Sequence, residues 1–308
     1  MSMFSWYWPT SENDVKLSEQ KMFKDLTHDY KIHQVPIFEG KEHINTITVL
    51  PTVKVHGSSE DEGVCADIAT AIGTSRDSTA DVVIAHGYGC GIGHYFKNYE
   101  PIARDTQRRV HGIDWLGMGN SSRPNMSKNP DDVETIESLY VQSLEEWRQA
   151  MNIDKMVLVG HSLGGYLSAA YALKYPQYIE KLVLASPVGI PERPAEVPER
   201  IKQLTGMRKL AYNVVRMGWD ANITAQPHLS FHYSIKNETV FLYGSEDWMD
   251  KSAAEQVSLT MDVPTRVHVI SQAGHNLFAD NHIEFNRVLV EEILGTKSTT
   301  TAPVSERA

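Results

Sequence analysis

The sequence predicts an α/β fold in which a mostly parallel sheet carries helices on both faces. Short apolar strands alternate with helical patterns over most of the chain, as expected for parallel strands joined by crossover helices. Uninterrupted apolar runs such as residues 156–159 are typical of strands that are buried on both faces. The 308 residues and a hydrophobic content of 41% suffice for one large domain with an inserted segment.

The N-terminal region, residues 1–29, is expected to form an aromatic arm. It contains Phe4, Trp6, Tyr7 and Trp8 within a few residues. Such rings favour the interface between lipid and water, but they also pack on protein surfaces. Contact with a lipid surface and packing on the protein itself therefore both stay open.

The first part of the core is expected over residues 30–186. Residues 30–38 and 44–50 are rich in β-branched residues and predict an opening strand pair. The polar stretch over about 56–80 predicts a surface insertion or a disordered loop. Alternating elements follow, with strands expected at 82–85, 109–114, 155–159 and 181–185, and helices at 132–151 and 165–175.

The alternation breaks over residues 187–238. Pro191, Pro194 and Pro198 interrupt it, and apolar residues then recur at helical spacing. An excursion at this point of a parallel sheet lies above the carboxyl ends of the strands, where ligands bind. We therefore expect a short cap there.

The second part of the core is expected over residues 239–295. It contains predicted strands at 239–243 and 266–270 and a last amphipathic helix at 283–294. Residues 296–308 are rich in Thr, Ser and Pro and predict a disordered tail.

Charge and cysteine content narrow the possible functions. The net charge of −10, with no basic stripe, argues against a nucleic-acid binder. Cys65 and Cys90 are too few for a disulfide framework or a zinc site, which favours a reducing compartment. The sequence shows neither a secretory signal nor a run of transmembrane length. We therefore expect an intracellular protein that is not secreted.

A candidate nucleophile lies in residues 160–164, which read Gly-His-Ser-Leu-Gly. An apolar strand precedes this pattern and a helical stretch follows it, which is the context of a nucleophile elbow. The tight turn exposes the hydroxyl of Ser162 beside the positive end of the helix. Ser162 is thus the predicted nucleophile.

The partners of such a serine are a base and an acid, which follow later strands in this arrangement. His275 lies on a loop after the strand predicted at 266–270, and it is the expected base. Asp247 follows the strand predicted at 239–243 and is the expected acid, with Asp250 as the alternative.

The donors that stabilise an oxyanion are expected in two places. Residues 86–91 follow a buried strand, and their glycines let backbone N–H groups approach a substrate oxygen. The N–H groups of Tyr88 and Leu163 are the predicted oxyanion hole, and Cys90 is interpreted as a small space-filling residue. The glycine turn at 114–124 is interpreted as a structural bend, since it carries no Walker lysine.

A second pattern overlaps the predicted base. His275 and Asp280 have the spacing of a motif known from glycerolipid acyltransferases. The alternative interpretation of Asp280 is a cap for the last helix, which is expected to begin near residue 283.

Further stretches resemble one family. They are residues 8–11 (WPTS), 86–89 (HGYG), 119–124 (GNSSRP), 143–148 (SLEEWR), 154–156 (DKM), 173–176 (LKYP), 191–194 (PERP) and 274–280 (GHNLFAD). With the serine turn they cover most of the chain. The sequence resembles the α/β-hydrolase-domain 4 and 5 subfamily, whose relatives include plant lysophosphatidic acid acyltransferases and the yeast cardiolipin deacylase.

The resemblance implies glycerophospholipids, lysophospholipids or N-acyl phosphatidylethanolamine as substrates, and action at membranes, mitochondria or lipid droplets. Some members carry Asn in place of the elbow serine and act as lipase coactivators, so Ser162 favours a hydrolase. Members also differ over whether the acid matches Asp247 or Asp250. The segment 187–238 is considerably shorter than the cap of the family.

These observations predict an α/β-hydrolase fold and a serine hydrolase that cleaves acyl esters of phospholipids through an acyl-enzyme on Ser162. No metal and no organic cofactor is expected. Two alternatives stay open. One is an acyl-CoA-dependent lysophosphatidic acid acyltransferase that uses His275 and Asp280, and the other is a non-catalytic lipase coactivator.

Overall fold

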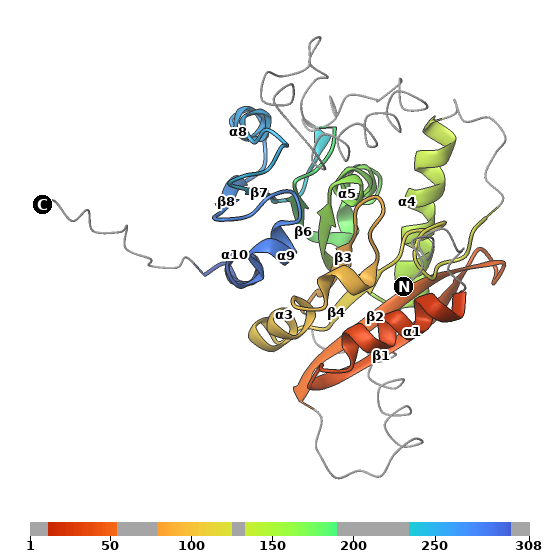
Figure 1. Cartoon of the computed structure of the whole chain (residues 1–308). Helices are drawn as coiled ribbons and strands as arrows, with labels where there is room; N and C mark the ends of the chain where they lie inside the picture. Colours follow the sequence, from red (N-terminus) through yellow and green to blue (C-terminus); the bar gives the residue numbers. More distant parts are fainter. Residues whose placement is uncertain (1–11, 54–78, 125–132, 190–233, 297–308) are drawn as a thin grey trace, which may run out of the picture.

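The computed structural model describes residues 12–53, 79–124, 133–189 and 234–296 (Figure 1). These residues form an eight-stranded sheet with the order β1-β2-β4-β3-β5-β6-β7-β8. The strands are β1 (His28–Ile37), β2 (Glu42–Val53), β3 (Asp81–Ala85), β4 (Val110–Ile113), β5 (Met156–His161), β6 (Ile179–Ala185), β7 (Thr239–Gly244) and β8 (Thr265–Ile270).

The sheet is parallel except at its N-terminal edge. β2 pairs antiparallel with both β1 and β4, whereas the neighbouring pairs from β4 to β8 are all parallel. The predicted α/β class with a mostly parallel sheet is therefore confirmed.

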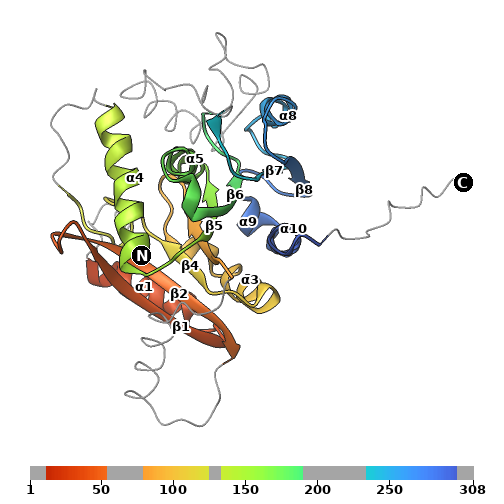
Figure 2. The ribbon, with the colours of Figure 1, turned by 180° about the vertical axis from the view of Figure 1, so that it is seen from behind.

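Helices cover both faces of this sheet (Figures 1 and 2). They are α1 (Glu12–Phe23), α3 (Tyr99–Thr106), α4 (Val133–Ala150), α5 (Leu163–Lys174), α8 (Ser252–Ser258), α9 (Leu277–Asp280) and α10 (His282–Leu294), with short 3-10 turns η2 (Ile92–Tyr95) and η3 (Pro176–Tyr178). Side chains of α4, α5 and α8 share one apolar cluster, and those of α1, α3, α9 and α10 share the other.

The alternation of side chains along β3 shows how the sheet supports two cores. Val83 and Ala85 point into the cluster under α4 and α5, while Val82 and Ile84 point into the opposite cluster. All five residues of the strand are buried. An uninterrupted apolar run is what such a doubly covered strand requires.

Four α-helices lie where no helix range was expected from the sequence. Helix α1 occupies part of the predicted aromatic arm, α3 and α8 lie in connections between strands, and α9 lies between β8 and α10. Residues 1–11 of the arm, 54–78 of the polar insertion, 190–233 of the expected cap and 297–308 of the tail lie outside the described residues. Among the helices that are described, none combines the length and the apolar character needed to cross a bilayer.

The parallel part of the sheet brings distant segments together at one edge. Residues 86–91 follow β3, Ser162 follows β5, Asp247 follows β7 and His275 follows β8. Because the carboxyl ends of parallel strands meet at the same edge, loops from four strands converge there.

Candidate active site

Ser162 occupies a strained turn between β5 and α5. Its backbone has φ 54° and ψ −117°, a conformation that residues with a side chain rarely adopt. The N–H of Ser162 donates to the carbonyl of Ala185 at 2.9 Å, which ties the turn to β6. The serine therefore sits at the tip of a sharp strand-to-helix turn, which is the geometry of a nucleophile elbow.

Close backbone contact explains the glycines that flank the serine. A Cβ atom on Gly164 would collide with the carbonyl oxygens of Ala85 and His86 at the end of β3. One on Gly160 would collide with Ser168 and with the backbone of Gly164. Only residues without a side chain let α5 start this close to the sheet.

His275 contacts Ser162, the predicted nucleophile, directly. Its Nε2 lies 3.1 Å from Oγ of Ser162, and its Nδ1 lies 3.3 Å from Oδ1 of Asp247. An ionised carboxylate can only accept, so the hydrogen of the imidazole resides on Nδ1, and Nε2 is free to accept the serine proton. The structure thus brings together three residues that are 85 and 28 positions apart along the chain, in the order serine, acid, base.

The environment of Asp247 keeps it ionised. Its side chain is 1% exposed, and burial alone raises the pKa of a carboxyl group. The hydrogen bonds from His275, Ser186 and the N–H of Met249 outweigh burial and leave the pKa of Asp247 below its usual value. A buried, ionised carboxylate is suited to hold an imidazole and to stabilise its protonated form.

Asp250, the alternative acid, has a different position. It is exposed, and its Oδ1 accepts the N–H of Ser252 at 2.9 Å at the start of α8. The structure therefore places Asp247, rather than Asp250, against His275.

The loop after β3 lies against the elbow. A Cβ atom on Gly87 would come within 2.9 Å of Cβ of Ser162, so the backbone before Tyr88 passes directly beside Ser162. Leu163 is the first residue of α5, where backbone N–H groups have no partner within the helix. The residue Tyr88 is 79% exposed. Cys90, in the same loop, is partly buried, and burial raises the pKa of its thiol.

The buried carboxylate of Asp114 holds the loop after β3 in place, a role that no local spacing indicates. Asp114 is fully buried and accepts from the N–H groups of Ile92 at 2.8 Å and Asn120 at 3.0 Å, and from the amide of Asn45 at 2.8 Å. It connects the glycine turn after β4 to the loop after β3. The interpretation of that turn as a structural bend agrees with these contacts.

Asp280 does not cap the last helix, so this interpretation was wrong. The cap of α10 is Asn281, whose side chain accepts the N–H of Glu284 at 3.2 Å. Asp280 ends α9 and accepts the N–H of Gly274 at 2.9 Å. It therefore fixes the peptide group between Ala273 and Gly274, just before His275 in the chain.

Two rings beside His275 were also missed. The ring centroids of His161 and Trp248 each lie 4.9 Å from that of His275. His161 is a variable position of the Gly-x-Ser-x-Gly pattern, and Trp248 follows the predicted acid. Their roles depend on neighbours from other strands, which no local spacing reveals.

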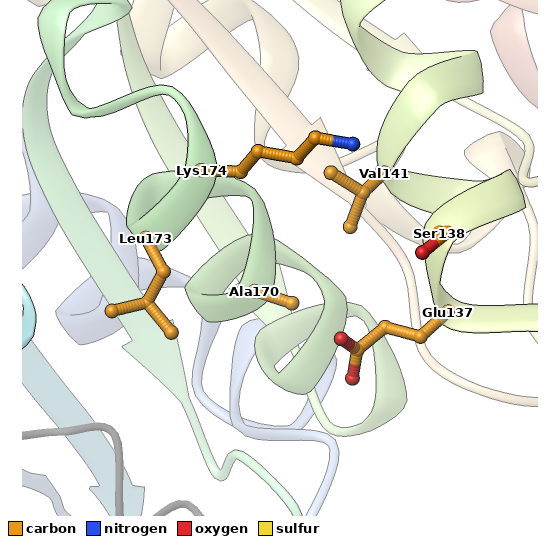
Figure 3. A pocket seen from close by; sticks show the side chains of 6 residues that line it. All are labelled: Glu137, Ser138, Val141, Ala170, Leu173 and Lys174. Carbon is orange, nitrogen blue, oxygen red and sulfur yellow. The ribbon is translucent and has the colours of Figure 1, made fainter. Parts of the chain in front are cut away.

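A surface cavity of about 280 Å³ lies between α4 and α5 (Figure 3). Its lining residues are Glu137, Ser138, Val141, Ala170, Leu173 and Lys174. None of the three contacting residues Ser162, Asp247 and His275 belongs to this lining, so the cavity is separate from them. Within the described ranges, no cluster of three or more His, Cys, Asp or Glu side chains could hold a metal ion.

Comparison with known proteins identifies the family. Residues 82–218 match a family described as alpha/beta hydrolase fold. A bovine (lyso)-N-acylphosphatidylethanolamine lipase is 30% identical over 279 residues, which cover 71% of this chain and 80% of the lipase. This chain belongs to the α/β-hydrolase family.

Other α/β-hydrolase relatives carry acyltransferase names. The rat 1-acylglycerol-3-phosphate O-acyltransferase ABHD5 is 38% identical over 185 residues, covering 60% of this chain but 44% of the rat protein. The chain thus spans less than half the length of that relative. A 1-acylglycerol-3-phosphate O-acyltransferase of Arabidopsis thaliana is 26% identical over 352 residues, covering 92% of this chain and 80% of the plant protein. These names confirm the resemblance to the α/β-hydrolase-domain 4 and 5 subfamily.

Solved structures agree on the α/β-hydrolase fold. Carboxylesterase CesB of Bacillus subtilis superposes with a TM-score of 0.62 at 14% identity, covering 92% of this chain and 97% of the esterase. A bacterial membrane phospholipase A gives a TM-score of 0.57 at 18% identity, covering 92% of this chain and 90% of the phospholipase. At such identities the likeness concerns the fold alone.

Proposed function

We propose that this α/β-hydrolase cleaves acyl esters of glycerophospholipids or lysophospholipids, with Ser162 as the nucleophile. The observation that carries the proposal is the 3.1 Å contact between Oγ of Ser162 and Nε2 of His275, with Asp247 on the far side of the imidazole. A hydroxyl, an imidazole and an ionised carboxylate in this order constitute a catalytic triad.

The first half of the reaction forms an acyl-enzyme. Oγ of Ser162 attacks the acyl carbonyl while Nε2 of His275 takes the hydroxyl proton. Asp247 stabilises the imidazolium that results. The oxyanion of the tetrahedral intermediate is expected to accept hydrogen bonds from the N–H groups of Leu163 and Tyr88. His275 then protonates the leaving alcohol, and the C–O bond breaks.

The second half releases the acid. A water molecule attacks the acyl group on Ser162 and passes its proton to His275, and the second tetrahedral intermediate collapses to free fatty acid and Ser162. No step in this sequence requires a metal ion or an organic cofactor.

The names of the relatives support a lipid substrate. The bovine relative is named a lipase of (lyso)-N-acylphosphatidylethanolamine, and the rat and plant relatives are named for 1-acylglycerol-3-phosphate. Both kinds of substrate are glycerophospholipids with an acyl chain. We therefore propose peripheral action on membranes, mitochondria or lipid droplets inside the cell, with the aromatic residues at 4–8 as a further point of contact with lipid.

A second candidate is acyl transfer from acyl-CoA to lysophosphatidic acid, which the names of the rat and plant relatives favour. Asp280 would matter as much as Ser162 in that reaction. However, the carboxylate of Asp280 is exposed and accepts the N–H of Gly274, which supports a role in shaping the loop of His275.

Two assays on the same preparations test the proposal. A fluorophosphonate probe is expected to label the wild-type chain, and vesicles that contain N-acyl phosphatidylethanolamine or lysophospholipid are expected to release fatty acid. Ser162→Ala is expected to lose both signals, while Ser258→Ala, a serine on α8, retains them. Ester formation from labelled acyl-CoA and lysophosphatidic acid that survives Ser162→Ala but not Asp280→Ala would contradict the hydrolase proposal.

A further inference from the structure

A second histidine is buried beside the candidate triad. His161 is the last residue of β5 and is 3% exposed. Its Nε2 lies 2.9 Å from the backbone carbonyl oxygen of His275. A carbonyl oxygen can only accept a hydrogen bond, so Nε2 of His161 carries the hydrogen and donates it.

This hydrogen bond acts on the loop that connects β8 to α9. His275 lies between β8 and α9, and its neighbour Asn276 is exposed. Side chains fix two peptide groups of this loop, the Ala273–Gly274 group before His275 and the His275–Asn276 group after its Cα. Asp280 accepts the N–H of Gly274, and His161 donates to the carbonyl of His275.

The ring of His161 is suited to be a neutral donor. Burial, followed by the proximity of His275, lowers the pKa of His161 to about 3. Asp247 and His86 are the other titratable groups that act on this ring. Within the described part of the chain, the buried Nδ1 has no hydrogen-bond partner, which agrees with a ring that carries a single hydrogen, on Nε2. A neutral neighbour does not repel the imidazolium that forms on His275.

We propose that His161 is a positioning residue whose Nε2–H holds the backbone of His275, so that the His275 imidazole spans Ser162 and Asp247. Its effect on turnover rests on the proposed function, whereas the contact itself does not. Displacement of a catalytic group by about 1 Å can cost on the order of 100-fold in rate, so the loss of a single hydrogen bond that positions His275 can slow the reaction. Phe278 packs edge-on against His161 with ring centroids 4.9 Å apart, which limits the alternative orientations of the donor.

Two substitutions separate the hydrogen bond from the bulk of the ring. His161→Gln keeps an uncharged N–H donor near the position of Nε2, and His161→Phe keeps a ring without a donor. His282→Gln, a histidine at the start of α10, is the matched control. The first readout is the rate at which a fluorophosphonate probe labels Ser162. The second is the NMR chemical shift of the His275 Nδ1 proton, which reports its contact with Asp247 and needs no substrate.

His161→Phe is expected to slow labelling by about tenfold, the usual range for loss of one hydrogen bond, while His161→Gln stays within about threefold of wild type. The resonance of the His275 Nδ1 proton is expected to move upfield in His161→Phe, because its hydrogen bond to Asp247 weakens, and to keep its wild-type position in His161→Gln and His282→Gln. Wild-type values in His161→Phe, or equal losses in the Phe and Gln variants, would overturn the proposal.

The wild-type spectrum offers a test that does not depend on the folding of any variant. The ¹⁵N shifts of His161 are expected to report hydrogen on Nε2 and no titration between about pH 5 and 9, since the ring is neutral there. Titration of His161 in this range, or hydrogen on Nδ1, would overturn the proposal even if the chain is a good hydrolase. The converse outcome is a probe that labels no Ser162 while His161 shows hydrogen on Nε2 and no titration. That result would reject the hydrolase function and leave the proposed contact intact.

Discussion

Asp280 accepts the backbone N–H of Gly274 at 2.9 Å, one residue before the imidazole that contacts Ser162. This hydrogen bond gives a structural reason for an aspartate at position 280, whose spacing from His275 resembles an acyltransferase motif. The donor and the acceptor are six positions apart along the chain, and the bond closes the turn that leads from β8 into α9.

We predict that Asp280→Ala lowers ester hydrolysis by about tenfold, because the His275 loop loses one hydrogen bond. Asp280→Asn retains a side-chain oxygen and is expected to stay close to wild type. Fatty-acid release and acyl transfer from acyl-CoA are measured on the same samples. If Asp280 serves acyl transfer alone, Asp280→Ala will leave hydrolysis unchanged, which contradicts the prediction.

The second prediction concerns the identity of the acid. Asp247→Asn is expected to lower turnover by on the order of 10⁴-fold, because the neutral amide no longer holds His275 in the required tautomer. Asp250→Asn is expected to change turnover little, since Asp250 accepts the N–H of Ser252 at the start of α8. Steady-state rates of both variants decide between them. A larger loss in Asp250→Asn than in Asp247→Asn would reassign the acid.

The third prediction concerns stability at acid pH and uses Glu292 on α10. Burial raises its pKa, but hydrogen bonds from His268 and Arg266 outweigh burial and lower the pKa from 4.5 to about 2. A carboxyl group with a lowered pKa stabilises the native state above its unfolded pKa, and this contribution is lost as the pH falls from about 4.5 towards 2.

Glu292→Gln is therefore expected to reduce the free energy of unfolding at neutral pH, with a deficit that shrinks as the pH falls below about 4.5. Urea unfolding at a series of pH values measures this deficit. Glu255→Gln, an exposed glutamate on α8, is the control and is expected to change little. If the deficit of Glu292→Gln does not change with pH, the negative charge of Glu292 contributes nothing to the free energy of unfolding.

The sequence predicts the parallel strands well because most of them, such as β3, β5 and β7, are buried apolar runs with their own local signal. Helix α1 lacks such a signal, since most of its residues are polar and its contacts, such as Phe23 in the second core cluster, come from distant elements. The same difference between local signals and contacts with distant elements applies to the candidate active site. The elbow of Ser162 is visible in five consecutive residues. The roles of His161 and Asp280 arise only when the loops after β5 and β8 meet, so no spacing along the chain predicts them.

The last prediction tests how closely the elbow must approach the sheet. Gly164 lies against the carbonyl oxygens of Ala85 and His86, and an added Cβ atom would collide with both. Backbone cannot yield as a flexible side chain does, so Gly164→Ala must push the start of α5 away from β3. That shift carries Ser162 and the N–H of Leu163 with it. We therefore expect Gly164→Ala to lose more than about 100-fold in probe labelling of Ser162, even where circular dichroism reports a folded chain.

Gly40→Ala is the matched control for this change. Gly40 has φ +81°, and an added Cβ atom there would meet nothing within 4 Å. Its substitution is expected to cost about 1 kcal/mol of stability through backbone strain and to leave labelling unchanged. Because both variants add the same methyl group, a selective loss in Gly164→Ala measures the contact between elbow and sheet. Equal labelling in the two variants would mean that the elbow tolerates displacement from β3, and the close packing of the strand ends would then have no bearing on the reactivity of Ser162.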